Sequence, residues 1–430
     1  MFIITRVTRP RRPEALLHND VESSEADEPA LLRSETDRAG GKSARAPSGQ
    51  LLFVVNSLAG GGAERVFSTV LAGLEPMLRR FEVHVALLDQ EPAAYSLPEW
   101  VHIHQLDCRG SLVRSVRQLS ALAGRLRPQL VFSFLTRANV AAVAAARRAR
   151  CPVVISERND TTAQLSHGRM PALARAIVRL AYKRADSVIA VSSGLHESLA
   201  GDYGVDPRRI TVINNPVDVD AIRSAGEQPP SIEVRPGDVV MLARLEPQKN
   251  LPVAIRAFAA SGVEGRLVIL GEGSLRQELR AIGDSCGLGD RLVMPGHAAN
   301  PFAVLSRASV FMLTSRHEGF CNSLVEAMAL GIPVLASDCR FSPAEILDVE
   351  RSPGPGEVIE GQGGLLVAVD DVEAFTSGLR MLADPGLRAR LGRLGEQRVQ
   401  AFAAPAQIAR YGDLIAQALA SGARPGSRAA

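Results

Sequence analysis

Two carboxylates at a fixed interval give the clearest chemical signal in the sequence. Glu318 and Glu326 flank the segment Gly-Phe-Cys-Asn-Ser-Leu-Val, which follows an apolar run typical of a buried strand. This order predicts a loop carboxylate and a helical carboxylate on either side of a helix N-terminus. Backbone N–H groups there can bind a diphosphate, while the carboxylates accept hydrogen bonds from sugar and ribose hydroxyls. The N–H groups concerned belong to Gly319, Phe320, Cys321, Asn322 and Ser323. The alternative is that Glu318 is a solvated loop charge and Glu326 a helix-surface residue.

Two permanent cations form a second candidate site. Arg244 and Lys249 are five residues apart in the segment Arg-Leu-Glu-Pro-Gln-Lys-Asn, which spans a predicted strand end and helix start. Guanidinium and ammonium groups so placed are suited to the two phosphates of a diphosphate leaving group. Considered alone, the segment favours the usual fate of surface Lys and Arg, which is a solvated loop charge.

A glycine-rich loop supplies the third signal. Gly60-Gly61-Gly62 joins an apolar run to a helix-like segment that starts near Ala63. Glycine lets the backbone approach an anion closely, and the helix N-terminus offers free N–H groups. Gly61 and Gly62 can therefore bind a phosphate or an acceptor group, and the alternative is a tight strand-to-helix turn. The loop is not G-x-G-x-x-G, and no acidic residue follows at the spacing of a dinucleotide fold, which disfavours a dehydrogenase.

These segments need a scaffold that brings strand ends and helix starts together. Short apolar runs alternate with Ala- and Arg-rich helical stretches, which predicts parallel sheets covered on both faces. We expect strands at 51–56, 81–88, 130–134, 153–156 and 187–191, and then at 239–243, 266–270, 291–294, 310–314, 334–337 and 364–369. Such sheets bind ligands at the carboxyl ends of their strands, so two facing halves would form a cleft between them.

The length of 430 residues favours two domains. Residues 1–49 mix charges with Pro, Gly and Ser without a sustained period, which predicts a disordered tail. The α/β pattern restarts after Asn214-Asn215-Pro216, where a polar stretch separates two regions of similar order. We therefore expect α/β architecture with two doubly wound, Rossmann-like domains at 50–225 and 236–405.

Composition excludes several classes of protein. Apolar residues make up 46% and charged residues 22%, as in soluble globular proteins. The net charge is only +3 and the basic residues are spread along the chain, so nucleic acid is not an expected partner. The five cysteines lie far apart without a C-x-x-C pair, which favours a reducing cytoplasm over disulfides or a zinc site. The sequence contains no apolar run of about 18 residues, so a membrane span is not expected. It also lacks a leader pattern, so secretion is not expected.

The segment from Glu318 to Glu326 resembles the E-x7-E motif of retaining GT-B glycosyltransferases of family four, and a typical G-x-P-V sequence follows at 331–334. The resemblance extends over about residues 50 to 415. Further segments in the family's order are the glycine-rich loop, Arg244 and Lys249, Gly271-Glu272-Gly273, Pro295-Gly296 and Ser342-Pro343-Ala344-Glu345-Ile346. Gly-Gly-Ala-Glu-Arg-Val and the segment 155–160 look like the branch that builds bacterial surface glycans, often with N-acetylhexosamine donors.

The resemblance implies a role for each motif residue of the second half. Arg244 and Lys249 would neutralise the diphosphate, Glu326 would hold the ribose hydroxyls, and Glu318 would contact the donor sugar near its C3 and C4 hydroxyls. Members of the family are generally thought to retain anomeric configuration by a front-face route, in which the leaving phosphate helps to deprotonate the incoming hydroxyl. Positioning and charge stabilisation are then the main catalytic effects, and no protein nucleophile is expected.

The resemblance also implies a binding role for each half of the chain. Residues 50–225 would bind the acceptor, residues 236–405 would bind the nucleotide-sugar donor, and residues 406–430 would form a C-terminal helix returning toward the first domain, followed by a tail. Gly61 and Gly62 would approach the β-phosphate or the acceptor from the opposite wall of the cleft. Closure would exclude the water that could hydrolyse the donor.

The sequence departs from the family at one place. Many relatives carry a histidine just after the fourth strand, whereas residues 132–139 read Phe-Ser-Phe-Leu-Thr-Arg-Ala-Asn. Thr136 or Asn139, or the Arg137 between them, is therefore a candidate contact for donor or acceptor, although Asn139 can equally be a helix cap. His102 and His104 alternate to one face of an apparent strand and are read as structural or exposed. We expect no metal site and no cofactor, since the nucleotide sugar is a substrate.

Residues 169–184 form a candidate helix in which Arg and Lys interrupt apolar residues. Such a helix can lie on an anionic membrane near a polyprenyl-diphosphate-linked glycan acceptor. The alternative is an ordinary amphipathic helix packed on the acceptor sheet. The expected location is the cytoplasm, with peripheral contact at the inner face of the membrane. The expected partners are a nucleotide-sugar donor, taken as a UDP-sugar by resemblance, and a glycan or lipid-linked acceptor.

Two other functions remain compatible with this fold. A nucleotide-sugar epimerase has the same architecture, because fold does not fix function. A non-catalytic glycan-binding protein could descend from a transferase. The two carboxylates Glu318 and Glu326, together with Arg244 and Lys249, favour the transferase over both.

Overall fold

The computed structural model describes residues 48–166 and 170–422. All of them belong to one compact unit. The predicted tail at 1–49 lies outside the described residues except for Ser48 and Gly49, and so does the end of the chain from 423 onward.

A seven-stranded parallel sheet organises the first half, in the order β3-β2-β1-β4-β5-β6-β7. Its strands are β1 (Gln50–Val55), β2 (Glu82–Leu87), β3 (His102–Gln105), β4 (Leu130–Phe134), β5 (Val153–Glu157), β6 (Ser187–Ala190) and β7 (Ile210–Val212). The strand order reverses at β1, which pairs with both β2 and β4. Loops that follow β1 and β4 therefore diverge to opposite sides of the sheet, which is the usual setting of a ligand site in doubly wound folds.

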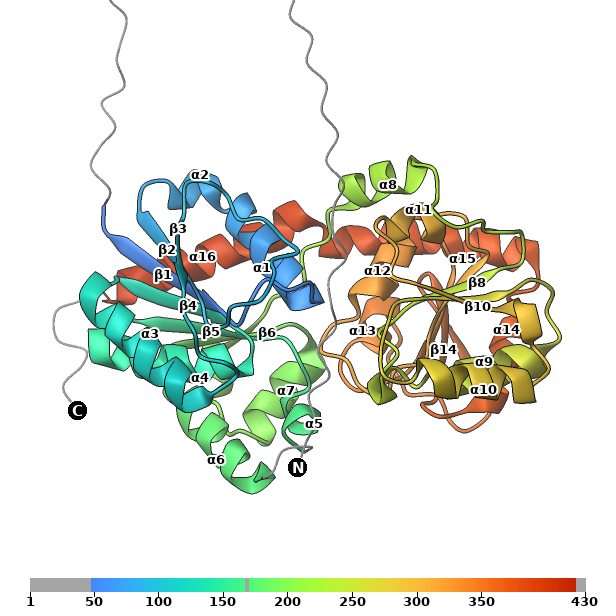
Figure 1. The fold of residues 1–430 in the computed structure, drawn as a ribbon, viewed down its shortest axis with the longest axis horizontal. Coiled ribbons are helices and arrows are strands. Elements are labelled where there is room, and N and C mark those ends of the chain that lie inside the picture. Colours follow the sequence, from blue (N-terminus) through green and yellow to red (C-terminus); the bar gives the residue numbers. More distant parts are fainter. Residues whose placement is uncertain (1–47, 167–169, 423–430) are drawn as a thin grey trace, which may run out of the picture. The chain divides into compact units, whose positions relative to one another are not determined.

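Helices cover both faces of this sheet because its strands are apolar on both sides. Leu52 and Val54 pack in one core and Leu51, Phe53 and Val55 in another. The first core takes α3 (Leu112–Leu126), α4 (Thr136–Ala149), α6 (Pro171–Tyr182) and α7 (Ser193–Gly201), and the second takes α1 (Gly62–Gly73), α2 (Glu75–Leu78) and α16 (Ala404–Gly422). A short helix, α5 (Thr161–Ser166), precedes α6. The last helix, drawn in red in Figure 1, thus completes the first half of the fold.

The second half contains another seven-stranded sheet, in the order β10-β9-β8-β11-β12-β14-β13. Its strands are β8 (Val239–Leu242), β9 (Leu267–Leu270), β10 (Leu292–Gly296), β11 (Val310–Leu313), β12 (Val334–Ser337), β13 (Val358–Gly361) and β14 (Gly364–Val367). Its helices are α8 (Val219–Glu227), α9 (Leu251–Ser261), α10 (Arg276–Ser285), α11 (Pro301–Leu305), α12 (Asn322–Ala329), α13 (Pro343–Leu347), α14 (Val372–Met381) and α15 (Pro385–Arg398). Buried residues of α9, α10 and α14 share a core with one face of the sheet, and those of α12 and α13 with the other.

The expected architecture of two doubly wound α/β sheets is confirmed. Each strand expected from the sequence is present, but β7 and β13 were not expected. The prediction of wholly parallel sheets is wrong at β13, which runs antiparallel to β14 in a hairpin at the sheet edge. The residue bounds placed on the two domains stay a prediction.

The chain passes between the halves at two adjacent points. Val217 donates its N–H to the carbonyl of Phe402 at 2.9 Å, and Ala404 donates to the carbonyl of Val217 at 2.9 Å. These bonds join the segment before α8 to the segment before α16. Any change in the separation of the halves must be accommodated there.

A buried ion pair stabilises the start of the second sheet. Asp238 is completely buried, and its carboxylate accepts hydrogen bonds from the Arg266 guanidinium at 2.6 Å and from the backbone N–H groups of Arg235 and Arg266, each at 2.8 Å. Breaking a buried pair by removing one partner typically costs about 3–5 kcal/mol. We therefore expect Asp238→Ala to lower the free energy of unfolding by that amount in urea denaturation. Glu233→Ala, which removes an exposed partner of Arg235, is the matched control and should stay near wild type. Equal effects of the two changes would contradict the assigned role of Asp238.

Candidate functional site

The three predicted motifs meet in one cleft of about 380 Å³, called here the central cleft. The glycine-rich loop before α1 and the loops after β8 and β11 form most of its wall, and Tyr95, Arg158, Asn159 and Asn215 complete it. Of the residues predicted from the sequence, it is lined by Gly61, Gly62, Arg244, Lys249, Glu318, Gly319, Phe320, Cys321, Asn322, Ser323 and Glu326. Motifs up to 265 residues apart in the chain thus reach a single site because each follows the carboxyl end of a parallel strand.

Hydrogen bonds fix the two loops of the second half against each other. Thr314 donates its hydroxyl to the carbonyl of Lys249 at 2.8 Å, and the Gln248 side chain donates to the carbonyl of His317 at 2.7 Å. The backbone N–H of Arg316 donates a hydrogen bond to the carbonyl of Gln248 at 2.9 Å. Lys249 is therefore held beside the loop that carries Glu318.

Lys249 and Glu318 form a largely buried ion pair. Lys249 Nζ lies 2.5 Å from Glu318 Oε1, and their side chains are 16% and 12% exposed. The Ser315 hydroxyl donates to the same oxygen at 2.7 Å. Burial alone would lower the pKa of Lys249, but the charge and hydrogen bond of Glu318 outweigh it and raise the pKa above its ordinary value. Lys249 is therefore held in its charged form by this partner, and neither side chain is a solvated loop charge.

Glu326 forms a second ion pair, this one across the cleft. Its carboxylate, only 7% exposed on α12, accepts a hydrogen bond from the guanidinium of Arg65 on α1. The charge of Glu326 is the main cause of a raised pKa for Arg65. The alternative interpretation of Glu326 as a helix-surface residue is therefore wrong.

Between the two carboxylates lies the N-terminus of α12. No described side chain caps this helix, and its first residues Asn322 and Ser323 line the cleft. Contrary to the expectation from the sequence, the N–H of Asn322 is not open to a ligand, because it donates to the carbonyl of Phe320 at 3.0 Å. Uncapped N–H groups at a helix N-terminus are a favourable site for an anion. Arg244, exposed on the opposite loop, adds a further positive charge. The cleft therefore combines anion-binding groups with buried carboxylates that can accept hydrogen bonds from hydroxyls.

Cys321 lines the cleft but does not supply a nucleophile. Its side chain is buried, and burial raises the pKa of the thiol well above its ordinary value. Its N–H donates to the Ser342 hydroxyl at 3.2 Å. A neutral thiol is a poor nucleophile. Cys321 therefore lines the cleft as part of the loop after β11 and takes no part in bond formation.

Glycine is required at position 319 because the backbone of the first half packs closely against this loop. A Cβ atom at this position would lie 1.9 Å from the carbonyl oxygen of Arg158. Ser192 adds a hydrogen bond to the carbonyl of Gly319 at 3.2 Å. This part of the loop after β11 is therefore packed against the end of β5 and the start of α7.

We expect Gly319→Ala to reduce the activity of the site by about 100-fold, because misplacing a site loop by about 1 Å can cost that much. The added methyl must displace either the backbone near Arg158 or the loop that carries Glu318. Gly201→Ala is the matched control, since an added Cβ meets no described atom within 4 Å there. Initial rates and thermal unfolding of the two variants provide the check. Wild-type rates in Gly319→Ala would show that this contact does not position the loop.

The structure does not place Thr136 or Asn139 at the central cleft. The Thr136 hydroxyl donates to Glu157 Oε2 at 2.9 Å, and Asn139 Nδ2 donates to the carbonyl of Ser156 at 2.9 Å. Both side chains are buried in this network at the end of β5, so the predicted contact with donor or acceptor is not supported. The helix-cap alternative for Asn139 is wrong, because Asn139 lies inside α4, whose N-cap position is Leu135.

Several cleft residues were given no role from the sequence. Arg65 was quoted only within its motif, and Asn215 was read only as part of the domain junction, although its side chain donates to Asn322 Oδ1 at 2.6 Å. Tyr95 and Asn159 also line the cleft. The Tyr95 hydroxyl lies 3.4 Å from the carbonyl of Gly60. Arg65 and Asn159 had a sequence signal, because both lie in segments that carry the family resemblance.

The described residues contain neither a candidate metal cluster nor a candidate membrane-spanning helix. In residues 48–166 and 170–422, no group of three or more His, Cys, Asp or Glu side chains could hold a metal ion. Within the same ranges, no helix is both long and apolar enough to cross a membrane.

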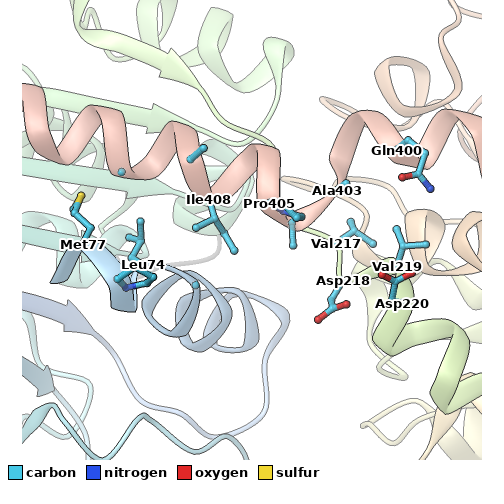
Figure 2. A pocket seen from close by; sticks show the side chains of 15 residues that line it. Leu74, Met77, Val217, Asp218, Val219, Asp220, Gln400, Ala403, Pro405 and Ile408 are labelled. Atoms are coloured by element: carbon cyan, nitrogen blue, oxygen red, sulfur yellow. The ribbon is translucent and has the colours of Figure 1, made fainter. Parts of the chain in front are cut away.

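A larger pocket of about 690 Å³ lies away from these motifs, beside the two chain crossings. Figure 2 shows Leu74 and Met77 facing Ile408 and Pro405 of α16. Asp218 and Asp220 supply its carboxylates. It contains none of the predicted site residues, so size alone does not identify the site of chemistry.

Comparisons with protein families match both halves of the chain. Residues 60–221 match the model described as Glycosyltransferase Family 4. Residues 226–398 match the model described as Glycosyl transferases group 1. Together the two matches cover every motif residue of the central cleft.

Two relatives from Campylobacter jejuni match along most of their length. The chain is 28% identical over 367 residues to N-acetylgalactosamine-N,N'-diacetylbacillosaminyl-diphospho-undecaprenol 4-alpha-N-acetylgalactosaminyltransferase, covering 82% of this chain and 95% of the relative. It is 26% identical to an alpha-1,4-N-acetyl-D-galactosaminyltransferase acting on a GalNAc-containing diNAcBac-PP-undecaprenol, covering 82% and 94%. The crystal structure of Anabaena HepE in complex with UDP has the same fold, with a TM-score of 0.67 at 18% identity over 86% of this chain and 100% of that one.

Proposed function

Since the chain belongs to the glycosyltransferases that join a family 4 half to a group 1 half, we propose that it is a retaining enzyme that moves a sugar from a nucleotide diphosphate donor, a UDP-sugar, to a glycan or lipid-linked acceptor. The observation that carries this proposal is the central cleft itself. There Arg244, Lys249 and the uncapped N-terminus of α12 converge beside the paired carboxylates Glu318 and Glu326.

Each group has a defined place in donor binding. Arg244, Lys249 and the N–H of Ser323 in the first turn of α12 bind the diphosphate, which carries the negative charge of the donor. The N–H groups of Cys321 and Asn322 already donate to the Ser342 hydroxyl and to the carbonyl of Phe320. Glu326 accepts hydrogen bonds from the ribose hydroxyls, and Glu318 accepts them from the sugar. Because both carboxylates are ion-paired and largely buried, their oxygens are held in fixed positions for hydroxyl donors.

The reaction follows from this arrangement. The acceptor hydroxyl oxygen forms a bond to the anomeric carbon on the face that the diphosphate leaves, and the bond between that carbon and the phosphate oxygen breaks. The hydroxyl proton passes to the departing phosphate. Arg244 and Lys249 stabilise the charge that develops on this leaving group, and their fixed positions need little reorganisation during the reaction. No protein nucleophile and no metal or other cofactor is assigned a step.

We propose a polyprenyl-diphosphate-linked glycan of bacterial surface polysaccharide synthesis as the acceptor. The first Campylobacter jejuni relative carries a diphospho-undecaprenol acceptor in its name and matches over nearly its whole length. Its name also makes UDP-N-acetylgalactosamine the first donor to test. In this proposal the first half of the chain binds the acceptor, and Gly61 and Gly62 on its wall of the cleft approach the β-phosphate or the acceptor.

In this proposal helix α6 is the surface of the protein that faces the membrane, where the lipid-linked acceptor lies. The large apolar side chains of Met170, Leu173 and Leu180, on this helix or next to its start, are 63%, 50% and 57% exposed. Arg175 and Arg179 are exposed on the same helix. Exposed apolar residues beside basic ones are typical of helices that lie on anionic bilayers. We therefore place the enzyme at the inner face of the membrane as a peripheral protein.

Vesicle flotation tests this surface. Reversing the charges of Arg175, Arg179 and Lys183 should abolish binding to vesicles that contain anionic phospholipid, while binding to neutral vesicles stays at background. Reversal of Arg390, an exposed residue on α15 paired with Glu360, should leave vesicle binding unchanged. Unchanged binding in the α6 variant would rule out this helix as the contact.

The donor and the stereochemistry are tested with a panel of UDP-, GDP- and ADP-sugars. Titration calorimetry identifies the nucleotide, and proton NMR of the product reports the anomeric configuration of the new linkage. We expect tight binding of one nucleotide series and a product of unchanged configuration. An inverted linkage would refute retention, and conversion of the donor without acceptor would favour an epimerase or a hydrolase.

A further inference from the structure

Arg65 has no role in the site as described so far. It lies in the first turn of α1, four residues after Gly61, and its guanidinium is bonded to Glu326 across the central cleft. Its side chain is 37% exposed, so part of the guanidinium faces solvent in the cleft. An arginine carries five N–H donors, and Glu326 is the only partner of this guanidinium among the described side chains. Donors of Arg65 therefore remain for a ligand.

The position of Arg65 fits a diphosphate better than a neutral ligand. Gly61, Gly62 and the N-terminus of α1 lie on the same wall of the cleft, and Arg244 and Lys249 lie on the other. Arg65 is the cation of the first wall beside the glycine-rich loop. Arg158 also lines the cleft, but its guanidinium is buried and donates to the hydroxyls of Ser156 and Tyr411. Glu64 follows the same loop, but among the described residues it is not part of the cleft lining.

Arg65 also borders a second pocket of about 240 Å³, together with Glu326. This pocket is lined by apolar side chains including Val325, Ile222 and Phe302. The ion pair therefore lies between the central cleft and this second pocket, whose lining also includes Thr69, Asp218 and Asn322.

Resting on the proposed function, we propose that Arg65 is a donor-binding residue of the first half, which contacts the diphosphate of the nucleotide sugar while it holds Glu326 in place for the ribose. Each half of the chain then contributes a cation to the same diphosphate. Donor binding is thereby coupled to the approach of the two halves, because Arg65 and Glu326 lie on opposite sides of the cleft.

Comparison of UDP with uridine isolates the phosphate contact. Arg65→Gln should weaken UDP binding by about tenfold or more, as expected for loss of a charge-assisted hydrogen bond, and weaken uridine binding distinctly less. Arg65→Lys should recover part of the UDP affinity, because it restores the charge. Arg79→Gln, which alters an exposed pair with Glu75 on α2, is the control and should bind both ligands like wild type.

Three outcomes would overturn the inference. Tighter binding of both ligands in Arg65→Gln would mean that Arg65 only blocks Glu326. Equal weakening of UDP and uridine would mean that it only positions Glu326, and wild-type binding of both would mean that it has no role. If wild type binds UDP and Lys249→Ala weakens UDP binding, any of these outcomes contradicts only the inference about Arg65. If wild type binds no nucleotide diphosphate, the proposed function fails as well.

Discussion

Lys249→Ala is expected to reduce sugar transfer by about 100- to 1,000-fold, the range observed when one preorganised charge stabiliser of a transition state is removed. Lys249 is held at its place by the backbone contact with Thr314 and by the ion pair with Glu318. Its charge acts on the leaving diphosphate, so the loss should be in kcat as well as in donor binding. Initial rates at saturating donor measure it.

Removing Lys249 also leaves the buried carboxylate of Glu318 without its cation, which destabilises the protein. The double variant Lys249→Ala/Glu318→Gln separates the two effects, because it removes the unpaired charge. We expect it to recover much of the thermal stability and none of the transfer rate. Recovery of the rate together with stability would show that Lys249 acts through the fold rather than on the diphosphate.

Glu326→Ala is expected to weaken transfer by about 100-fold through loss of the ribose acceptor and of the Arg65 pair. A hydroxyl that forms the same hydrogen bond in the ground state and in the transition state contributes to KM, so the larger change should be in KM for the donor. Glu396→Ala is the matched control, since Glu396 is a half-exposed residue of α15 that pairs with Arg223 of α8. Normal donor KM in Glu326→Ala would overturn the assignment of the ribose contact.

Much of the site could be predicted because its chemistry is encoded locally. Glu318 and Glu326 are eight residues apart, and the strand, loop and helix signals around them are short-range. The same holds for Arg244 and Lys249 after β8. Each motif marks the end of a parallel strand, and the doubly wound fold brings such ends together without further information.

The pairings within the site could not be predicted from the sequence. Arg65 and Glu326 are separated by 261 residues, and Lys249 and Glu318 by 69. Whether a carboxylate in a motif is solvated or ion-paired depends on which loop lies opposite it. That information is in the packing of the two halves and has no local signature.

The errors have similar physical causes. Thr136 was expected at the ligand because it follows β4, but its hydroxyl turns toward the buried carboxylate of Glu157, which needs donors. β13 was missed because its four residues carry little apolar periodicity and depend on the hairpin with β14. Short edge strands are set by their partner strand more than by their own sequence.

The most direct test of the central claim is release of UDP from a UDP-sugar by the full chain, measured with and without a polyprenyl-diphosphate-linked glycan. We expect release of UDP that depends on the acceptor, matches the amount of glycan extended, and falls in Lys249→Ala and Glu326→Ala. Release without acceptor, or nucleotide binding with no glycan extended for any donor of the panel, would contradict the claim that the central cleft transfers a sugar.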